Sequence, residues 1–235
     1  MTSPDDPFDG LAERADRIGV ELDGGQVDLL RRHFDLLVER NRHVNLTRVT
    51  DPGEAVRKLY LSSLALFPVL ADIGVAVQGL FSALDLGTGA GFPGIPVAVA
   101  APNLEMTLID ARAKKVRFLE DAIGALDLAG RVTARHVRGG DFVEGRGRFH
   151  LVTARAVTTA AGTVAEAAGL LTPGGFLVIQ KGEKLTAEEI AEGDRAADRY
   201  GMMSIGTFDQ PVEDLTPRIM VYRNLNAADA GEVRS

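Results

Sequence analysis

The sequence LDLGTGAGFPGIP, residues 84–96, places four glycines and two prolines directly after an apolar run. Gly87, Gly89 and Gly91 predict a strand that ends in a tight turn, whose backbone can meet a ligand without intervening side chains. Phe92-Pro93 then begins a helix, because proline suits a first helical turn. In an open α/β sheet, such a turn lies at the carboxyl end of a strand, where ligands bind.

From residue 82 onward, short apolar runs alternate with helical patterns. Strands are expected at 83–87, 106–110, 132–137, 150–156 and 176–182, with helices at about 93–101, 112–128, 158–171 and 185–200. This alternation predicts a parallel sheet covered by helices on both faces. The last two strand-like runs, 202–212 and 218–224, are joined by a short polar loop and predict an antiparallel pair at one sheet edge.

A helical region precedes the sheet. Residues 27–44 have apolar side chains at helical spacing, and Asp51-Pro52 is typical of the start of a further helix carrying Ala55, Leu59 and Leu66. We therefore expect an N-terminal helical region over 1–76, a catalytic α/β domain over 77–224 and a disordered tail over 225–235.

Composition narrows the class of protein. The 235 residues are 46% hydrophobic and 25% charged, as in an ordinary soluble globular protein. The absence of cysteine excludes disulfides, thiolate metal sites and a cysteine nucleophile, and it fits a cytoplasmic location. The acidic N-terminus lacks the apolar core of a signal peptide, and no apolar run reaches transmembrane length. No metal site and no membrane partner are expected.

The net charge of −7 argues against general affinity for nucleic acid. The charge is unevenly spread, however: residues 112–148 hold nine Arg or Lys against five acids, and residues 31–58 hold seven against four. These basic stretches are either solvated surface or local contacts for phosphates.

The glycine turn fits two cofactors. GAGFPG satisfies the dinucleotide pattern G-x-G-x-x-G, and Asp110 ends the second strand nineteen residues after Gly91, where an acid binds ribose hydroxyls. A nicotinamide cofactor and S-adenosylmethionine both carry that ribose. No tyrosine is followed by lysine four residues later, which disfavours a short-chain oxidoreductase. Asp85 either faces the ammonium of the methyl donor or is a buried capping carboxylate, and Asp110 can also cap the next helix.

Six segments resemble one family: NLT (45–47), LDLGTGAGFPGIP (84–96), LID-x-x-x-KK-x-x-FL (108–119), ARA (154–156), QKG (180–182) and PRIMVYR (217–223). They resemble ribosomal RNA small subunit methyltransferase G, also called GidB, over roughly residues 25–223. The resemblance implies a class I S-adenosylmethionine-dependent methyltransferase. Its Rossmann-like, seven-stranded, mostly parallel sheet would carry an N-terminal helical extension.

The resemblance also implies the reaction and the substrate. A methyl group passes from S-adenosylmethionine to N-7 of a guanine in the 530 loop of 16S rRNA, at position 527. The partner would be 16S rRNA, the small ribosomal subunit or an assembly intermediate, and the enzyme would be a monomer.

Site residues follow by position. The resemblance places Gly87, Gly89, Gly91 and Phe92 at the donor loop, Asp110 at the ribose, Gly139 and Gly140 at the adenine, and Arg155, a positioning residue, at the pocket mouth. It implies RNA contacts for Lys114, Lys115, Arg117, Lys181 and Arg218, for which solvated surface is the alternative.

The sequence departs from the family pattern in three places. Arg40-Asn41 stands where the family has Trp-Asn, the stretch Lys58 to Ser63 lacks the family's His and Asp, and Gly140 replaces the acid on the adenine side. A relative with another RNA target, a small-molecule methyltransferase and a non-catalytic ribosome-assembly factor therefore stay open.

No catalytic dyad is evident, and none is needed. His33, His43, His136 and His150 are scattered and are expected to be surface or strand residues. Guanine N-7 carries an in-plane lone pair, so it can attack a sulfonium methyl without losing a proton, and alignment alone can drive the reaction. The stretch TARAVTTAA (153–161) lacks the Asn/Asp-Pro-Pro-aromatic motif typical of exocyclic amine methylation.

Overall fold

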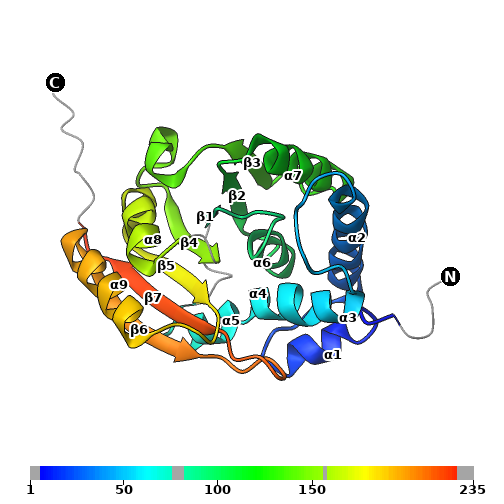
Figure 1. Cartoon of the computed structure of the whole chain (residues 1–235), viewed down its shortest axis with the longest axis horizontal. Helices are drawn as coiled ribbons and strands as arrows, with labels where there is room; N and C mark the ends of the chain where they lie inside the picture. The colour runs from blue at the N-terminus through cyan, green and yellow to red at the C-terminus, as the bar shows by residue number, and fades with distance from the viewer. Residues whose placement is uncertain (1–5, 76–81, 156–157, 227–235) are drawn as a thin grey trace.

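The computed structural model describes residues 6–75, 82–155 and 158–226 and contains a seven-stranded sheet (Figure 1). The strands are β1 Ser82–Leu86, β2 Glu105–Asp110, β3 Val132–His136, β4 Phe149–Arg155, β5 Leu171–Lys181, β6 Met202–Asp209 and β7 Arg218–Asn224. Their order is β3-β2-β1-β4-β5-β7-β6, and β7 runs antiparallel to both of its neighbours. The mostly parallel sheet and the antiparallel pair at its edge are confirmed.

The strand order reverses next to β1. β1 pairs in parallel with β2 on one side and with β4 on the other. The chain runs from β1 to β2 and β3 on one side of β1 and then crosses back from β3 to β4 on the other side. The crevice at the carboxyl ends of β1 and β4 is the place where open α/β sheets bind ligands. The loop rich in glycine follows β1 at this point.

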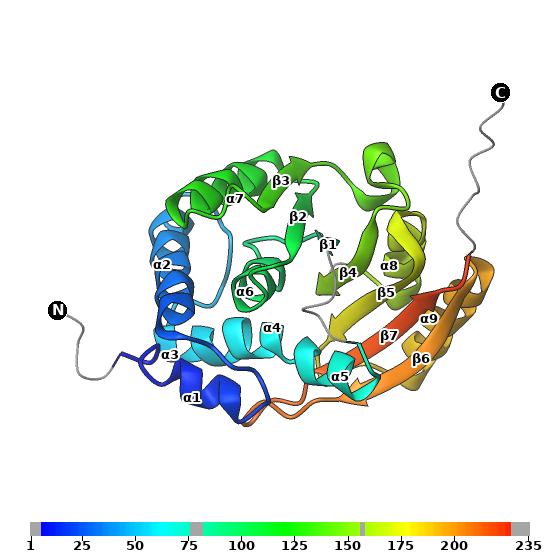
Figure 2. The same cartoon turned by 180° about the vertical axis from the view of Figure 1, so that it is seen from behind.

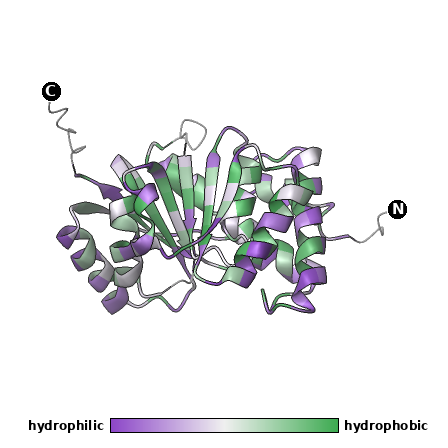
Figure 3. Cartoon of the chain, turned by 90° about the horizontal axis from the view of Figure 1, so that it is seen from above, coloured by the Kyte–Doolittle hydropathy of each residue, from purple (hydrophilic) through white to green (hydrophobic). Residues whose placement is uncertain are grey.

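Helices cover both faces of the sheet (Figure 3). α6 (Gly94–Ala100) and α7 (Ala113–Ala125) share an apolar cluster with the N-terminal helices, whereas α8 (Ala160–Ala167) and α9 (Ala187–Arg199) pack on a second cluster. The first cluster joins Leu30 and Leu64 to Leu108 of β2. The N-terminal helices and the sheet thus share one hydrophobic core.

The N-terminal region begins as the sequence predicts. α1 covers Leu11–Asp16, and α2 covers Gly24–Asn41, where Asp23 and Gln26 form a capping box. Asp51 caps α3 (Pro52–Ala55), with its side chain accepting from the Glu54 N–H. Figure 2 shows α2 beside α7, and α3, α4 and α5 in a row beneath the sheet.

The prediction of a single α-helix after Asp51 is wrong. A π-helical turn, Val56–Leu61, interrupts it, followed by α4 (Ser62–Leu64) and α5 (Leu66–Asp72). The physical reason lies in tertiary contacts, because the Arg155 guanidinium approaches the carbonyl oxygens of Lys58 and Leu59 within this turn.

Two further boundaries differ from the expected ones. The helix expected to reach residue 171 ends at Ala167, and β5 begins at Leu171, because Leu171 already pairs with Phe149 of β4. In the expected tail, the Leu225 N–H donates to the Gly201 carbonyl, and residues 227–235 lie outside the described residues. No helix in the described part of the chain is long and apolar enough to cross a membrane.

Gly94 tests the packing that positions the loop. A Cβ at Gly94 would lie 2.3 Å from Leu108 Cδ2 and 2.8 Å from Asp85 Oδ2. Gly94→Ala should therefore lower the free energy of unfolding by about 1–3 kcal/mol through overpacking. Denaturant unfolding measures it. The matched control is Gly124→Ala in α7, where a Cβ meets nothing within 4 Å, and helix propensity should stabilise that variant by up to about 1 kcal/mol. Equal effects of the two substitutions would contradict this packing.

Candidate active site

The loop that follows β1, residues 87–91, is called the donor loop after the role that the sequence predicts for it. Gly87 and Gly89 are half-buried, and the other three residues are buried. Gly87, Gly89 and Gly91 have φ values of 65°, 64° and 93°, which side-chain-bearing residues rarely adopt. The Thr88 N–H donates to the Ile109 carbonyl at 3.0 Å, which ties the loop to β2. The predicted turn is present, and its conformation depends on glycine.

Asp110 ends β2 and faces this loop. Its Oδ2 accepts from the Gly89 N–H at 3.1 Å, and its Oδ1 accepts from the Arg112 N–H at 2.8 Å. The residue is 6% exposed, so the carboxylate is held in place but borders the loop. Asp110 is not the N-cap residue of α7, because that position is Arg112, whose own side chain makes no cap hydrogen bond.

Lys115 turns toward the donor loop. Its Nζ lies 3.7 Å from Asp110 Oδ2, and a Cβ on Gly89 would lie 3.4 Å from the same nitrogen. Its side chain is 17% exposed. Lys114 and Arg117, on the same helix, are exposed. The structure therefore separates the predicted RNA contacts of α7 into one cation at the loop and two on the surface.

Asp85 is completely buried beneath the loop. Its Oδ2 accepts from the Gly94 N–H at 2.9 Å and its Oδ1 from Thr153 Oγ1 at 2.9 Å, so it holds the start of α6. This is the capping arrangement that the sequence left open. Burial raises the pKa of Asp85 to about 6, while these bonds and the Arg155 charge lower it.

Arg155, at the end of β4, joins the sheet to the N-terminal helices. Its Nη1 donates to Ser62 Oγ at 3.0 Å and to Ser63 Oγ at 3.3 Å. Its guanidinium carbon lies 5.6 Å from the centre of the Phe92 ring, a cation–π distance. Burial lowers the pKa of Arg155 to about 10, and the Asp85 charge acts in the opposite direction. Arg155 therefore links the donor loop to α4.

A cavity of about 640 Å³ adjoins Arg155 at the carboxyl ends of β4 and β5. It is lined by Lys58, Ser62, Arg155, Gln180, Lys181, Gly182, Glu183, Lys184, Leu185, Glu189, Leu215, Thr216 and Pro217. The volume is typical of a small-molecule or nucleotide site. We call it the acceptor cavity, after the role that is proposed for it under the proposed function.

The two C-terminal cations predicted to meet RNA have partners within the chain. Lys181 Nζ lies 2.9 Å from Glu189 and donates to the Thr158 carbonyl at 2.5 Å. Arg218 pairs with Asp209 at 2.9 Å and donates to the Leu185 carbonyl at 2.8 Å. Lys181 lines the acceptor cavity, whereas Arg218 of β7 is held by its ion pair with Asp209 of β6.

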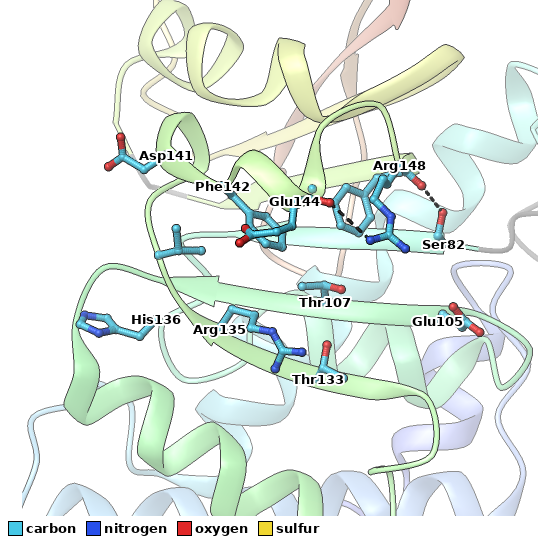
Figure 4. Close-up of a pocket in the computed structure, with 13 residues that line it drawn as sticks. Ser82, Glu105, Thr107, Thr133, Arg135, His136, Asp141, Phe142, Glu144 and Arg148 are labelled. Carbon is cyan, nitrogen blue, oxygen red and sulfur yellow. Dashed lines mark hydrogen bonds between the residues drawn. The ribbon is translucent and has the colours of Figure 1, made fainter. Parts of the chain in front are cut away.

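A second groove of about 830 Å³ opens on the sheet face that carries α8 (Figure 4). It exists because β3 and β4 are joined by 3₁₀ turns, Gly139–Asp141 and Val143–Gly145, instead of a helix. Gly139 is buried, and a Cβ there would lie 2.6 Å from Leu86 Cδ1; Gly140 is open. Ser82 and Glu105, which begin β1 and β2, line the far end of the groove, away from the donor loop.

Sequence reasoning missed His33. It was expected on the surface or in a strand, but it is fully buried in α2. Its Nδ1 lies 3.0 Å from Tyr60 Oη and its Nε2 lies 3.1 Å from the Ala90 carbonyl oxygen. The signal was present, because residues 30, 33, 34 and 37 share the apolar face of the helix.

The described residues hold no group of three or more His, Cys, Asp or Glu that could bind a metal. A bare loop, a carboxylate at the next strand end and an adjoining cavity make up the site. The model of a family described as "GidB: rRNA small subunit methyltransferase G" matches residues 26–205. The chain belongs to this family.

Curated relatives agree with the family model. The ribosomal RNA small subunit methyltransferase G of Desulfitobacterium hafniense (strain Y51) is 39% identical over 188 residues, which cover 79% of this chain and 74% of the relative. That of Sorangium cellulosum (strain So ce56) is 34% identical over 219 residues, covering 92% and 87%. The predicted family and the predicted enzyme class, a methyltransferase, are confirmed.

Solved structures agree on the fold. An S-adenosylmethionine-dependent methyltransferase from Aquifex aeolicus superposes with a TM-score of 0.56 at 16% identity, covering 74% of this chain and 93% of that one. The branched-chain polyamine synthase of Thermus thermophilus has a TM-score of 0.57 at 18% identity, covering 72% and 57%. The class I methyltransferase architecture predicted from the sequence is confirmed.

The buried Asp85 predicts a pH effect on stability. Because its pKa rises from 3.8 to about 6 on folding, its contribution is full below pH 3.8 and is lost as pH rises through 6. Relative to Asp85→Asn, the wild type should therefore lose about 2 kcal/mol of unfolding free energy between pH 4 and 6. Urea unfolding of both proteins at several pH values measures the difference in unfolding free energy. His33 contributes with the opposite sign, but both proteins contain it, so its contribution cancels. A pH-independent difference would contradict the burial of this carboxylate.

Proposed function

We propose that the chain transfers the methyl group of S-adenosylmethionine to N-7 of a guanine in the 530 loop of 16S rRNA, position 527, as a cytoplasmic monomer. The observation that carries this proposal is the donor loop, which faces the Asp110 carboxylate and adjoins a cavity through Arg155. Family membership supplies the rRNA substrate.

The residues at the loop fit the methyl donor. The positive φ values of Gly87, Gly89 and Gly91 give the loop a shape that side-chain-bearing residues rarely adopt, and Asp110 offers a fixed carboxylate for ribose hydroxyls. Gly139 and Gly140, at the end of β3, would border the adenine, and Phe92 the sulfur-bearing end. The bound donor supplies an electrophilic methyl group. Asp85 holds the loop from below.

The acceptor cavity would orient the guanine. Arg155 lines the cavity and lies 5.6 Å from the ring of Phe92, the residue that follows the donor loop, so Arg155 could align a planar base with the donor. N-7 has a free lone pair, so this arrangement requires no general base, and alignment carries the rate enhancement. Lys58 and Lys181 line the cavity wall and would meet the phosphates of a flipped-out nucleotide.

Exposed cations on α7 would bind the RNA backbone. Lys114 and Arg117 are on the surface, and no ion pair within the described residues involves either of them. They lie on the helix that Asp110 precedes, so an RNA bound along α7 passes the donor loop. Because the net charge is −7, this local patch predicts binding that weakens steeply with salt.

One experiment tests the proposed reaction. The protein is incubated with labelled S-adenosylmethionine and small subunits that lack the modification, as well as with naked 16S rRNA, and the labelled base is mapped. The expected label is on N-7 of one guanine in the 530 loop, with assembled particles preferred. A label on another base, or binding of RNA without transfer, would favour another target or an assembly factor.

Asp110→Asn should weaken donor binding. Loss of the charged acceptor at the loop should raise the dissociation constant for S-adenosylmethionine about ten- to hundred-fold. Isothermal titration measures it. Asp127→Asn, at an exposed carboxylate after α7, is the matched control and should bind as the wild type does. Wild-type affinity in Asp110→Asn would rule out this carboxylate as a donor contact.

Reversing the α7 charges should separate RNA binding from donor binding. Lys114→Glu with Arg117→Glu should weaken binding to the RNA substrate at least ten-fold and reduce the salt slope by about two, while donor affinity stays unchanged. Arg195→Glu with Arg199→Glu, at two exposed positions of α9, is the control with the same change of net charge. Filter binding at several salt concentrations gives both quantities. Equal losses in the α7 and α9 variants would mean that only net charge matters.

A further inference from the structure

Two buried hydrogen bonds connect the donor loop to the N-terminal helices: His33 contacts the Ala90 carbonyl, and Tyr60 contacts His33. His33 of α2 and Tyr60 of the π-helical turn are both fully buried. The His33 ring lies 5.2 Å from the Phe92 ring and 6.1 Å from the Phe118 ring, in an otherwise apolar layer. Polar groups in such a layer are costly unless they are bonded, so their two hydrogen bonds define their orientation.

The direction of these bonds follows from the chemistry of the partners. The Ala90 carbonyl can only accept, so His33 Nε2 carries the hydrogen and donates at 3.1 Å. Burial lowers the pKa of His33 to about 4, so the ring is neutral near pH 7 and Nδ1 has a free lone pair. Tyr60 Oη therefore donates to Nδ1 at 3.0 Å. The Ala90 carbonyl thus sets the tautomer of His33, and the Tyr60 hydroxyl stabilises it.

Ala90 is the residue through which this chain reaches the donor loop. It lies between Gly89, whose N–H donates to Asp110, and Gly91, whose φ is 93°. A Cβ on Gly91 would come 3.4 Å from His33 Nε2, so the backbone approaches the imidazole closely. The loop is thus held on one side by a carboxylate of the sheet and on the other by an imidazole of the N-terminal region.

The π-helical turn that carries Tyr60 also reaches the acceptor cavity. Lys58 and Ser62, on either side of Tyr60, line that cavity. Arg155 donates to the Lys58 carbonyl at 3.3 Å and to Ser62 Oγ at 3.0 Å. One short segment therefore contacts the donor loop through His33 and the acceptor cavity directly, and π-turns are frequent at functional sites.

We propose that His33, oriented by Tyr60, is a positioning residue for the methyl donor, holding the Ala90 peptide so that the loop keeps its donor-binding shape. This assignment rests on the proposed function of the loop. His33 does not touch the donor; it acts through the Ala90 carbonyl. The N-terminal helices therefore form part of the donor site.

The test compares two substitutions of His33, of which only one can replace the Nε2 hydrogen bond to Ala90. The amide nitrogen of His33→Gln can take the place of Nε2 and donate to Ala90, whereas that of His33→Asn is too short to reach. Titration with S-adenosylmethionine should show a dissociation constant raised about ten-fold in His33→Asn and less than three-fold in His33→Gln. Both variants should lose similar thermal stability, so affinity and not stability separates them.

Tyr60→Phe keeps the inference testable should His33→Asn fail to fold, because it removes only one oxygen. It should raise the dissociation constant two- to five-fold, and the KM for the donor likewise, with little change in kcat, since the loop binds ground state and transition state alike. Tyr222→Phe, at another fully buried tyrosine remote from the loop, is the control and should not change donor affinity.

The outcomes are distinct. Failure of the wild type to bind S-adenosylmethionine would overturn the proposed function, and this assignment with it. Donor binding by the wild type with unchanged affinity in Tyr60→Phe and His33→Asn would overturn the positioning role alone. Equal losses of affinity in His33→Asn and His33→Gln would also overturn it, because packing and not hydrogen bonding would then be the cause.

Discussion

The hydrogen bond from the Gly89 N–H to the Asp110 carboxylate is the constraint on which the site depends. It joins the ends of two neighbouring parallel strands and fixes a loop whose positive φ values suit glycine. The half-buried Gly87 and Gly89 carry no side chains, so their backbone lies next to a single oriented carboxylate. The proposed roles of the cavity, the cations and the N-terminal helices all assume that the methyl donor binds at Gly89 and Asp110.

The N-terminal helices are structural parts of the methyltransferase fold in this chain. They share an apolar cluster with β2 and α7, and their polar groups reach the sheet at two points, His33 to Ala90 and Ser62 to Arg155. Arg155 bonds Ser62 and Ser63, so its position depends on α4 as well as on β4. A substitution that moves these helices should therefore alter the conformation of both the donor loop and the acceptor cavity.

Local sequence patterns predicted much of this architecture. The glycine spacing placed the loop after β1, the apolar alternation gave the parallel strands, and Asp110 was placed at the end of the next strand. The features that the sequence did not reveal depend on residues far apart in the chain. Arg155 bonds the π-helical turn that contains Tyr60. Lys181 pairs with Glu189 and Arg218 with Asp209, and no local sequence pattern predicts either ion pair. His33 was recoverable from helical periodicity, but its partner at Ala90 was not.

The most direct test of the account is a crystal structure of the chain with S-adenosylhomocysteine, the product of the donor. The account predicts the ribose hydroxyls within hydrogen-bond distance of the Asp110 carboxylate and the amino-acid end along residues 87–91, with the sulfur directed toward Arg155 and the acceptor cavity. A ligand bound elsewhere, or a loop closed by Lys115 against Asp110 in the complex, would contradict it.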